Sequence, residues 1–411
     1  MKNIDKENIS FKTYLKVLFL LLFQPVKFFI RFFPRDKNIW LFGVAVGKRY
    51  ADNSKALFEY CNLLETQIRP IWITKNKKVK QEVKKLGYEC YLAYEPMGLY
   101  YSLRGGVYIY CSTTSDINHW TSFGAFNVNL WHGTPMKKIA RDIENSNDRY
   151  YKIKTSRGLK RIFYKLVFPG FFEKIDLFCS ASEEASKRYK SAWNLKNEQI
   201  KITGYPRNDK LFIKKELEIS EEKIKIVNNA FLNKKKIITY LPTYRERTSS
   251  VFPLDFKKLE KKMRELDAIF VIKLHPFDNS KFDLDDFSNI ICLESKIDIY
   301  PLLAISDILV TDYSSVVFDF IVLDRPIIYF VYDLEDYINN DRGMYEPFEK
   351  TIAGDIVINT EELLNSIEQN LKYDYQKKLR QKMISKYNYY LDNKNSERVY
   401  NQIIEVLKWK K

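Results

Sequence analysis

The stretch "NIWLFGVAVGKRYADNSKALFEYCNLLETQIRPIWIT", residues 38–74, contains one complete strand–helix–strand unit. Its two ends, residues 38–43 and 69–74, are short apolar runs of the kind found in parallel strands buried on both faces. Between them, residues 52–64 place Asn and Ser before an apolar pattern of helical period, which predicts a capped helix. Such units are right-handed, and repeated units build a doubly wound sheet.

The same alternation continues along the chain in two series. The first series predicts further strands at residues 88–92, 107–112, 126–132, 176–182 and 199–206. The second predicts strands at residues 235–243, 268–276, 289–294, 307–315 and 325–333, followed by long helices. We therefore expect an α/β protein with two facing, doubly wound, Rossmann-like domains that meet near Pro206 to Leu211. The expected parts are a membrane-associating segment at 1–34, domains at 35–206 and 207–390, and a carboxy-terminal helix at 391–411.

Composition narrows the class of partner. A chain of 411 residues with 45% hydrophobic residues is long enough for two cores. Its net charge of +16 predicts a polyanionic partner, such as anionic lipid headgroups or phosphorylated substrates. The sequence contains no recognisable zinc finger, RNP-like motif or recognition-helix module, so we expect no nucleic-acid partner. Five scattered cysteines without metal-ligand spacing predict free thiols in a reducing cytoplasm.

Residues 11–33 combine bulky apolar side chains with cations. The uninterrupted apolar run, residues 17–23, is far shorter than the ~20 residues of a spanning helix, and no small-residue cleavage site follows it. On a helix, the cations fall within about one third of the circumference: Lys12, Lys16, Lys27 and Arg31. The pattern predicts an amphipathic amino-terminal helix, kinked or split at Pro25, that attaches peripherally to an anionic membrane surface. The alternative is a helix packed on the protein's own core.

Five polar loops follow predicted strands. Because open α/β sheets bind ligands at the carboxyl ends of their strands, we expect these loops to meet in one cleft between the domains. Their candidate residues are His132, Gly133 and Thr134 in "LWHGTPMKK", Arg207, Asn208 and Asp209 in "TGYPRND", Thr243 and Arg245 in "YLPTYRER", Lys273 and His275 in "VIKLHP", and Asp312, Ser314 and Ser315 in "VTDYSSVVFDF".

Two of these loops suggest phosphate chemistry. Asp312 and the two serines precede a predicted helix, whose free N–H groups and partial positive charge would suit a phosphate group. Plain helix capping is the simpler alternative. Arg245 could bind the same phosphates through its planar, permanently charged guanidinium, or it could form a surface ion pair with Glu246.

The protein has only three histidines. His132 precedes a glycine that would let a ligand approach the backbone closely, and its ordinary pKa of about 6.5 suits a general base. His275 follows a buried strand that Pro276 ends, so it either hydrogen-bonds a neighbouring loop or faces a ligand. His119 has no comparable setting, and we expect it to be structural.

Together, the ordered elements "WHGTPMK", "TGYPRNDKL", "LPTYRE", "KLHP", "TDYSSVVFDF" and "RPIIYFVYDLEDY" resemble the CDP-glycerol glycerophosphotransferase family, which includes teichoic acid primases and polymerases. The resemblance implies a GT-B fold and a monotopic enzyme on the cytoplasmic face of the bacterial membrane. It implies transfer of a polyol phosphate from CDP-glycerol or CDP-ribitol to a polyprenyl-diphosphate-linked glycan acceptor, with release of CMP. It also makes His132 and His275 the catalytic histidines, and Arg245, Ser314 and Ser315 contacts of the donor pyrophosphate.

The resemblance leaves several points open. Either histidine could be the general base, although we assign that role to His132 and assign His275 to the pyrophosphate or the departing CMP. No acidic metal cluster is recognisable, so no cofactor is expected to be required, while a loosely held Mg²⁺ on the donor stays an alternative. A GT-B nucleotide-sugar glycosyltransferase is the competing enzyme class. A non-catalytic membrane- or nucleic-acid-binding protein that uses the basic surface is the competing class outside enzymes. The chain's size resembles a primase or a short polymerase; donor, product length and oligomeric state stay undecided.

Overall fold

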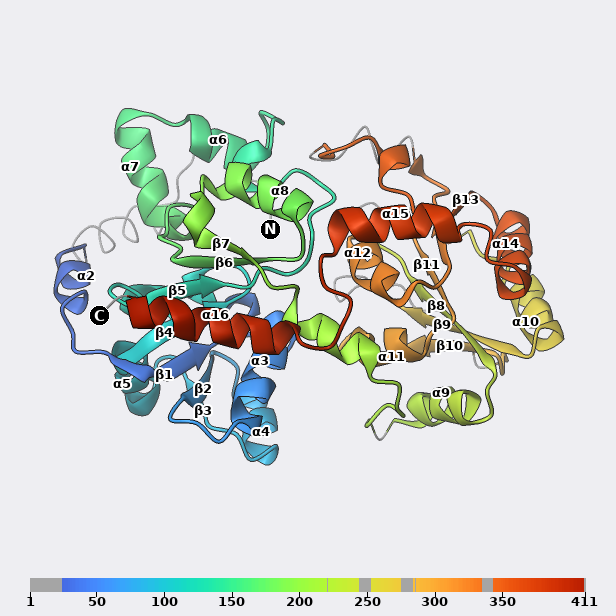
Figure 1. Ribbon diagram of the computed structural model, residues 1–411, viewed down its shortest axis with the longest axis horizontal. Helices are drawn as coiled ribbons and strands as arrows, with labels where there is room; N and C mark the ends of the chain where they lie inside the picture. Colours follow the sequence, from blue (N-terminus) through green and yellow to red (C-terminus); the bar gives the residue numbers. More distant parts are fainter. Residues whose placement is uncertain are drawn as a thin grey trace.

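The apolar runs predicted as strands form two parallel sheets, each in its own α/β domain (Figure 1). This computed structural model describes residues 24–219, 221–243, 253–274, 284, 286–334 and 343–409. The two domains lie side by side, with the first on the left of the figure and the second on the right. The expectation of two doubly wound α/β domains is confirmed.

The first sheet has seven strands in the order β3-β2-β1-β4-β5-β6-β7. They are β1 (Asp36–Phe42), β2 (Arg69–Thr74), β3 (Cys90–Leu92), β4 (Gly105–Tyr110), β5 (Phe126–Asn129), β6 (Leu177–Ser180) and β7 (Ile200–Ile202). The helices of this domain are α3 (Asp52–Leu63), α4 (Lys77–Lys85), α5 (Pro96–Arg104), α6 (Arg149–Thr155), α7 (Gly158–Val167) and α8 (Glu183–Trp193). Trp40 and Phe42 of β1 pack on one face of the sheet, and Leu41 packs on the other.

The second sheet has the strand order β10-β9-β8-β11-β12-β13 within the described residues. Its strands are β8 (Lys236–Leu241), β9 (Ala268–Lys273), β10 (Ile290–Leu293), β11 (Ile308–Thr311), β12 (Ile327–Phe330) and β13 (Asp355–Val357). Its helices are α9 (Glu222–Leu232), α10 (Phe256–Glu265), α11 (Ile299–Ile305), α12 (Val316–Phe320), α14 (Thr360–Lys372) and α15 (Lys377–Tyr387). The sequence did not predict β13, because its three residues are too few to show a pattern.

The last helix, α16 (Asn395–Trp409), returns to the first domain (Figure 1). Val399 and Ile403 are buried in the core beside β1, and the ring of Tyr400 lies 5.3 Å from that of Trp40. A 3₁₀ segment, η7 (Pro206–Phe212), links the two sheets and holds this helix, because the Asp209 carboxylate accepts the N–H groups of Asn395 at 2.8 Å and Ser396 at 2.9 Å. The domain limits at residues 34, 206 and 390 stay predictions.

Most of the predicted amino-terminal helix, residues 11–23, lies outside the described residues. The described part contains α2 (Gln24–Ile30), with Pro25 in its first turn. Phe28, Phe29 and Phe32 of this region are 60%, 70% and 68% exposed. Among the described residues, no helix is both long enough and apolar enough to cross a membrane.

Candidate functional site

The loop after β5 bends sharply because buried side chains hold its backbone. Trp131 has a φ of +51°, a left-handed conformation that costs a bulky residue free energy. Its N–H donates to the Oδ1 of Asn129 at 2.8 Å, and its carbonyl accepts the Nδ2 of Asn53 at 2.8 Å. Both asparagines are fully buried, so they hold the bend in place. The bend directs the next residue, His132, away from the sheet.

His132 is held in the tautomer that suits a base. Its Nδ1 lies 3.3 Å from the carbonyl oxygen of Cys111, which can only accept, so Nδ1 carries the proton and Nε2 keeps its lone pair. The imidazole stacks on Trp131 at a ring distance of 4.1 Å and is exposed to solvent. The surrounding protein lowers the pKa of His132 because it disfavours the charged ring; Asp52 opposes this shift and Arg207 adds to it.

Gly133 and Thr134 have structural positions in this loop. Gly133 has a φ of +109°, and a side chain there would place its Cβ 2.4 Å from Nη2 of Arg207. The hydroxyl of Thr134 is buried against that of Tyr205 at 3.1 Å, and Tyr205 in turn contacts Tyr189. A glycine is therefore required at position 133, and Thr134 faces the core rather than solvent.

Arg207 joins the two domains. Its Nη1 donates to Asp52, at the start of α3 in the first domain, and its Nη2 donates to Asp319 of α12 in the second, each at 2.7 Å. The hydroxyl of Tyr300 from α11 donates to the same Asp319 oxygen at 2.8 Å. Burial opposes the charge of Arg207, yet Asp319 and Asp52 hold its pKa well above the ordinary value. The neighbouring candidate, Asn208, is also buried.

Asp312 supports the loop after β8. Its fully buried carboxylate accepts the N–H of Thr243 at 2.9 and 3.1 Å, the Thr243 hydroxyl, and the N–H of Tyr313 at 2.6 Å. These bonds fix the position of Thr243, which precedes Arg245 by two residues in the sequence. Asp312 therefore shapes a loop at the carboxyl end of the second sheet. Arg245 itself lies outside the described residues.

Three candidates lie at strand ends of the second sheet with partly exposed polar groups. Ser314 and Ser315 are half-buried at the start of α12, and the Ser315 hydroxyl makes no capping bond there. Lys273 is half-buried at the end of β9, where burial lowers its pKa to about 8; Asp298 raises the pKa, and Arg49 of the first domain lowers it. His275, two residues further, lies outside the described residues.

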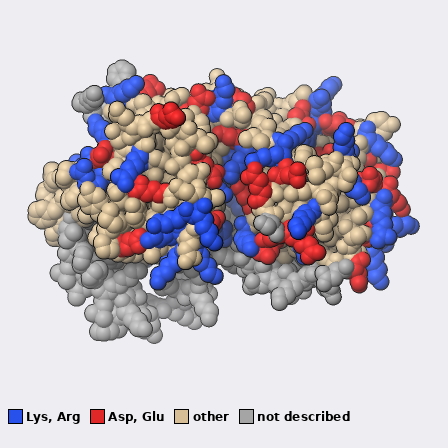
Figure 2. Space-filling model, turned by 90° about the horizontal axis from the view of Figure 1, so that it is seen from below, with Lys and Arg blue, Asp and Glu red and all other residues tan. Residues whose placement is uncertain are grey.

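The described candidates thus fall into two groups. His132, Gly133 and Arg207 meet at the domain junction, whereas Thr243, Asp312, Ser314, Ser315 and Lys273 line the carboxyl end of the second sheet. Lys and Arg side chains occur on both lobes beside the hollow between them (Figure 2). His119 lies apart from both groups, with its Nδ1 2.8 Å from the hydroxyl of Thr114.

Sequence reasoning missed three residues of the junction: Asp52, Asn53 and Asp319. Each supports the loop of His132 or Arg207 through the contacts above. Asp52 and Asn53 lie at the helix start "ADNSK", where two adjacent polar residues indicate ordinary helix capping. Only its place as the single charged residue in the apolar run "VVFDF" could have singled out Asp319. In the part of the chain that the structure describes, no group of three or more His, Cys, Asp or Glu could hold a metal ion.

Comparison with known proteins places this geometry in context. The model of the family described as "CDP-Glycerol:Poly(glycerophosphate) glycerophosphotransferase" matches residues 26–405. A teichoic acid poly(glycerol phosphate) polymerase of Bacillus spizizenii is 31% identical over 354 residues, which cover 83% of this chain and 85% of the polymerase. A teichoic acid glycerol-phosphate transferase of Staphylococcus aureus is 32% identical over 349 residues, covering 81% and 84%.

The fold has a solved counterpart. The structure of the wall teichoic acid polymerase TagF superimposes with a TM-score of 0.73 at 21% identity, covering 98% of this chain and 100% of that one. The likeness confirms the GT-B-like class expected from the sequence.

The buried ion pairs of Arg207 predict a large stability effect. We expect Arg207→Gln to lower the free energy of unfolding by about 3–5 kcal/mol, because two carboxylates would lose their partner and Asp319 is 1% exposed. The matched control is Arg398→Gln, whose partner Asp392 is 41% exposed, with an expected loss below about 1 kcal/mol. Urea denaturation measures both, and equal losses would contradict the role given to Arg207.

Proposed function

The chain belongs to the CDP-glycerol:poly(glycerophosphate) glycerophosphotransferase family, and on this premise we propose that it transfers glycerol phosphate from CDP-glycerol to a hydroxyl of a lipid-linked acceptor and releases CMP. As a member, it is a CDP-polyol polyolphosphotransferase that acts in teichoic-acid-type polymer synthesis. The observation that carries the proposal is the state of His132, a solvent-exposed imidazole with its Nδ1–H bound to Cys111 and its pKa lowered.

In this reaction, Nε2 of His132 accepts the proton of the acceptor hydroxyl as its oxygen attacks the phosphorus that bears the glycerol. A new P–O bond forms, the bond from that phosphorus to the bridging oxygen breaks, and CMP leaves with the electron pair. The proton then passes from His132 to solvent. Asp52 stabilises the transient imidazolium, because its negative charge favours the protonated ring.

The carboxyl end of the second sheet would hold the donor phosphates. Lys273, Ser314 and Ser315 contribute a cation and two hydroxyls there, and the first domain's Arg49 lies near enough to Lys273 to lower its pKa. Arg245 and His275 follow directly on two described strand ends and are proposed as further contacts. Fixed positive charge at this place would stabilise the negative charge that develops on departing CMP.

We further propose that the protein attaches to the cytoplasmic face of the bacterial membrane through its first domain. Exposed phenylalanines of the α2 region and exposed apolar side chains of α7, Leu159 at 85% and Ile162 at 51%, support this attachment. The α7 sequence "GLKRIFYKLV" adds cations to that apolar surface, and none of its residues is buried. Apolar side chains interleaved with cations are suited to the headgroup region of an anionic bilayer.

The first experiment measures CMP release with CDP-glycerol and CDP-ribitol supplied in parallel. Each reaction contains a synthetic lipid-linked disaccharide, with or without one glycerol phosphate attached. We expect acceptor-dependent CMP from CDP-glycerol, and a loss of at least about 100-fold for His132→Asn. CMP release from CDP-ribitol alone would show that the donor is CDP-ribitol. A preference for the acceptor without glycerol phosphate would indicate a primase, and a preference for the acceptor that carries it would indicate a polymerase. No CMP from either donor, with release of a nucleoside diphosphate from a nucleotide sugar, would overturn the proposal in favour of a glycosyltransferase.

The second experiment is a pH profile of kcat/KM. Catalysis needs neutral His132, so activity falls as pH drops through the pKa of this residue. Because the surrounding protein disfavours the charged ring and lowers that pKa below its ordinary value of about 6.5, we expect half-maximal activity on the acid side below pH ~6.5. An acid limb well above that value would show that another group, or a differently placed histidine, is the base.

The third experiment tests membrane attachment. We expect the double substitution Phe28→Glu and Phe29→Glu to reduce co-sedimentation with phosphatidylglycerol vesicles, because it places two anions on an exposed apolar surface. The control is Tyr373→Glu, which changes an exposed aromatic residue of the second domain. Equal binding of the double variant and the wild-type protein would contradict a role for α2.

A further inference from the structure

A short segment of the second domain lies along the loop that carries His132. This segment, residues 343–346, is called the strap below. The N–H of Lys138 donates to the carbonyl of Gly343 at 2.9 Å, and the N–H of Tyr345 donates to the carbonyl of Met136 at 3.2 Å. Lys137 and Met344 form the antiparallel bridge between these bonds. The strap therefore pairs with residues 136–138. These residues belong to the loop that follows β5 and carries His132, residues 130–142, which is called the catalytic loop below.

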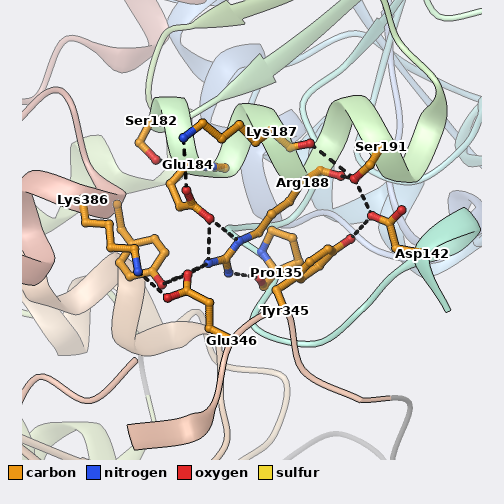
Figure 3. A network of polar contacts seen from close by, with 12 residues as sticks. Pro135, Asp142, Ser182, Glu184, Lys187, Arg188, Ser191, Tyr345, Glu346 and Lys386 are labelled. Carbon is orange, nitrogen blue, oxygen red and sulfur yellow. Dashed lines mark hydrogen bonds and ion pairs between the residues drawn. The ribbon is translucent and has the colours of Figure 1, made fainter. Parts of the chain in front are cut away.

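One guanidinium fastens both partners of this pairing (Figure 3). Arg188 of α8, in the first domain, is 3% exposed. Its Nη1 donates to the carbonyl of Pro135 at 2.7 Å, and its Nη2 donates to Glu346 of the strap at 2.5 Å. Glu184, one helical turn before Arg188, supplies a second carboxylate at 3.2 Å from within the same helix. From the second domain, the guanidinium is bound by Glu346 and by the hydroxyl of Tyr387, which accepts Nη2 at 3.0 Å; Glu346 alone of these carries a charge.

The carboxylate of Glu346 is stabilised in its charged form. Burial favours the neutral acid, but Lys386 and Arg188 hold the pKa of Glu346 below its ordinary value. Lys386 lies on α15, and the neighbouring Tyr387 donates its hydroxyl to Glu346 at 3.1 Å. Glu346 is therefore fixed to its own domain as well as to Arg188.

The preceding strap residue anchors the other side of the loop. The hydroxyl of Tyr345 donates to Asp142 at 2.6 Å, an oxygen that also accepts the Ser191 hydroxyl. The guanidinium of Arg188 lies over the Tyr345 ring, 5.2 Å from its centroid. The second domain thus binds this loop at Met136 and at Asp142, while Arg188 of the first domain binds it at Pro135.

The strap also belongs to the donor side of the protein. It lies in the chain that follows β12, which pairs with β11 in the second sheet. The strand β11 ends at Thr311, immediately before Asp312 and the two serines. The strap and the proposed phosphate contacts thus come from adjacent strands, and a displacement of the second domain would move both.

We propose that Arg188 and Glu346 are positioning residues that latch the second domain onto the catalytic loop, so that His132 reaches its reactive geometry only when the two domains are joined through the strap. The inference rests on the proposed function for its kinetic test. Without the latch, Asn53, Asn129, Cys111 and Tyr205 still hold the first residues of the loop. The residues from Pro135 onward would lose the ion pair that ties their guanidinium to the second domain, and would no longer follow that domain.

The test compares Glu346→Ala with Glu184→Ala in the full-length enzyme. Each removes one carboxylate from the same guanidinium, but only the first breaks an ion pair between the domains. We expect Glu346→Ala to lose at least about tenfold in kcat with little change in KM for CDP-glycerol, because small misplacements of a catalytic group are costly. We expect Glu184→Ala and Lys386→Met to stay within about twofold of wild type, since the latch survives in both.

A second measurement follows the pKa of His132 by NMR of the histidine-labelled enzyme. The charged groups that act on His132, Asp52 and Arg207, are unchanged in each variant. Removing a negative charge would by itself lower the pKa of an imidazole. We expect the opposite in Glu346→Ala, a rise toward about 6.5, because a loosened loop is better hydrated. Glu184→Ala should show no such rise.

Equal kcat and equal His132 pKa in Glu346→Ala and Glu184→Ala would overturn the latch. If the alanine variant does not fold, Glu346→Gln removes the charge at nearly unchanged shape and gives the same comparison. If the wild-type enzyme releases no CMP from either donor, the proposed function fails. The NMR titration would still decide whether the strap positions His132.

Discussion

The structure depends on one buried guanidinium. Arg207 pairs with Asp52 of the first domain and Asp319 of the second, each at 2.7 Å. Asp319 is 1% exposed, and a charge at this depth is stable only with a partner, so the second domain could not keep this carboxylate charged without Arg207. The same 3₁₀ segment caps α16 through Asp209. The chain thus crosses between domains twice at one place, and both sheets turn the carboxyl ends of their strands toward it.

This constraint also fixes the loop that carries His132. Gly133 can hold its left-handed conformation against Arg207 because it has no side chain, and Asn53 binds both the N–H of Arg207 at 3.1 Å and the carbonyl of Trp131 at 2.8 Å. His132 lies between these two contacts. The ion pairs of Arg207 therefore contribute to its position relative to the second domain, together with the strap. Its tautomer follows from Cys111, in the first domain alone.

The sequence predicted what depends on local pattern. Buried parallel strands appear in a sequence as continuous apolar runs, so they could be predicted. The polar loops could be predicted because each one follows such a run. The role of Arg207 could not be predicted, because Asp52 and Asp319 lie 155 and 112 residues away in the chain. Asp312 was predicted as a helix cap or a residue of the donor site. Its carboxylate accepts the N–H of Thr243, in a neighbouring strand-end loop that the sequence does not reveal as adjacent.

The two links between the domains differ in the free energy needed to break them. Arg207 is buried with two carboxylates, and separating it would leave charges without partners, at about 3–5 kcal/mol. The strap contributes two backbone hydrogen bonds, each worth about 1 kcal/mol net, the hydrogen bond from Tyr345 to Asp142, and an ion pair whose Glu346 is 20% exposed and can regain water. Because its charges can be rehydrated, the strap is the weaker of the two links. Arg188 binds both the strap and Pro135, so this weaker link is the one coupled directly to the loop that carries His132.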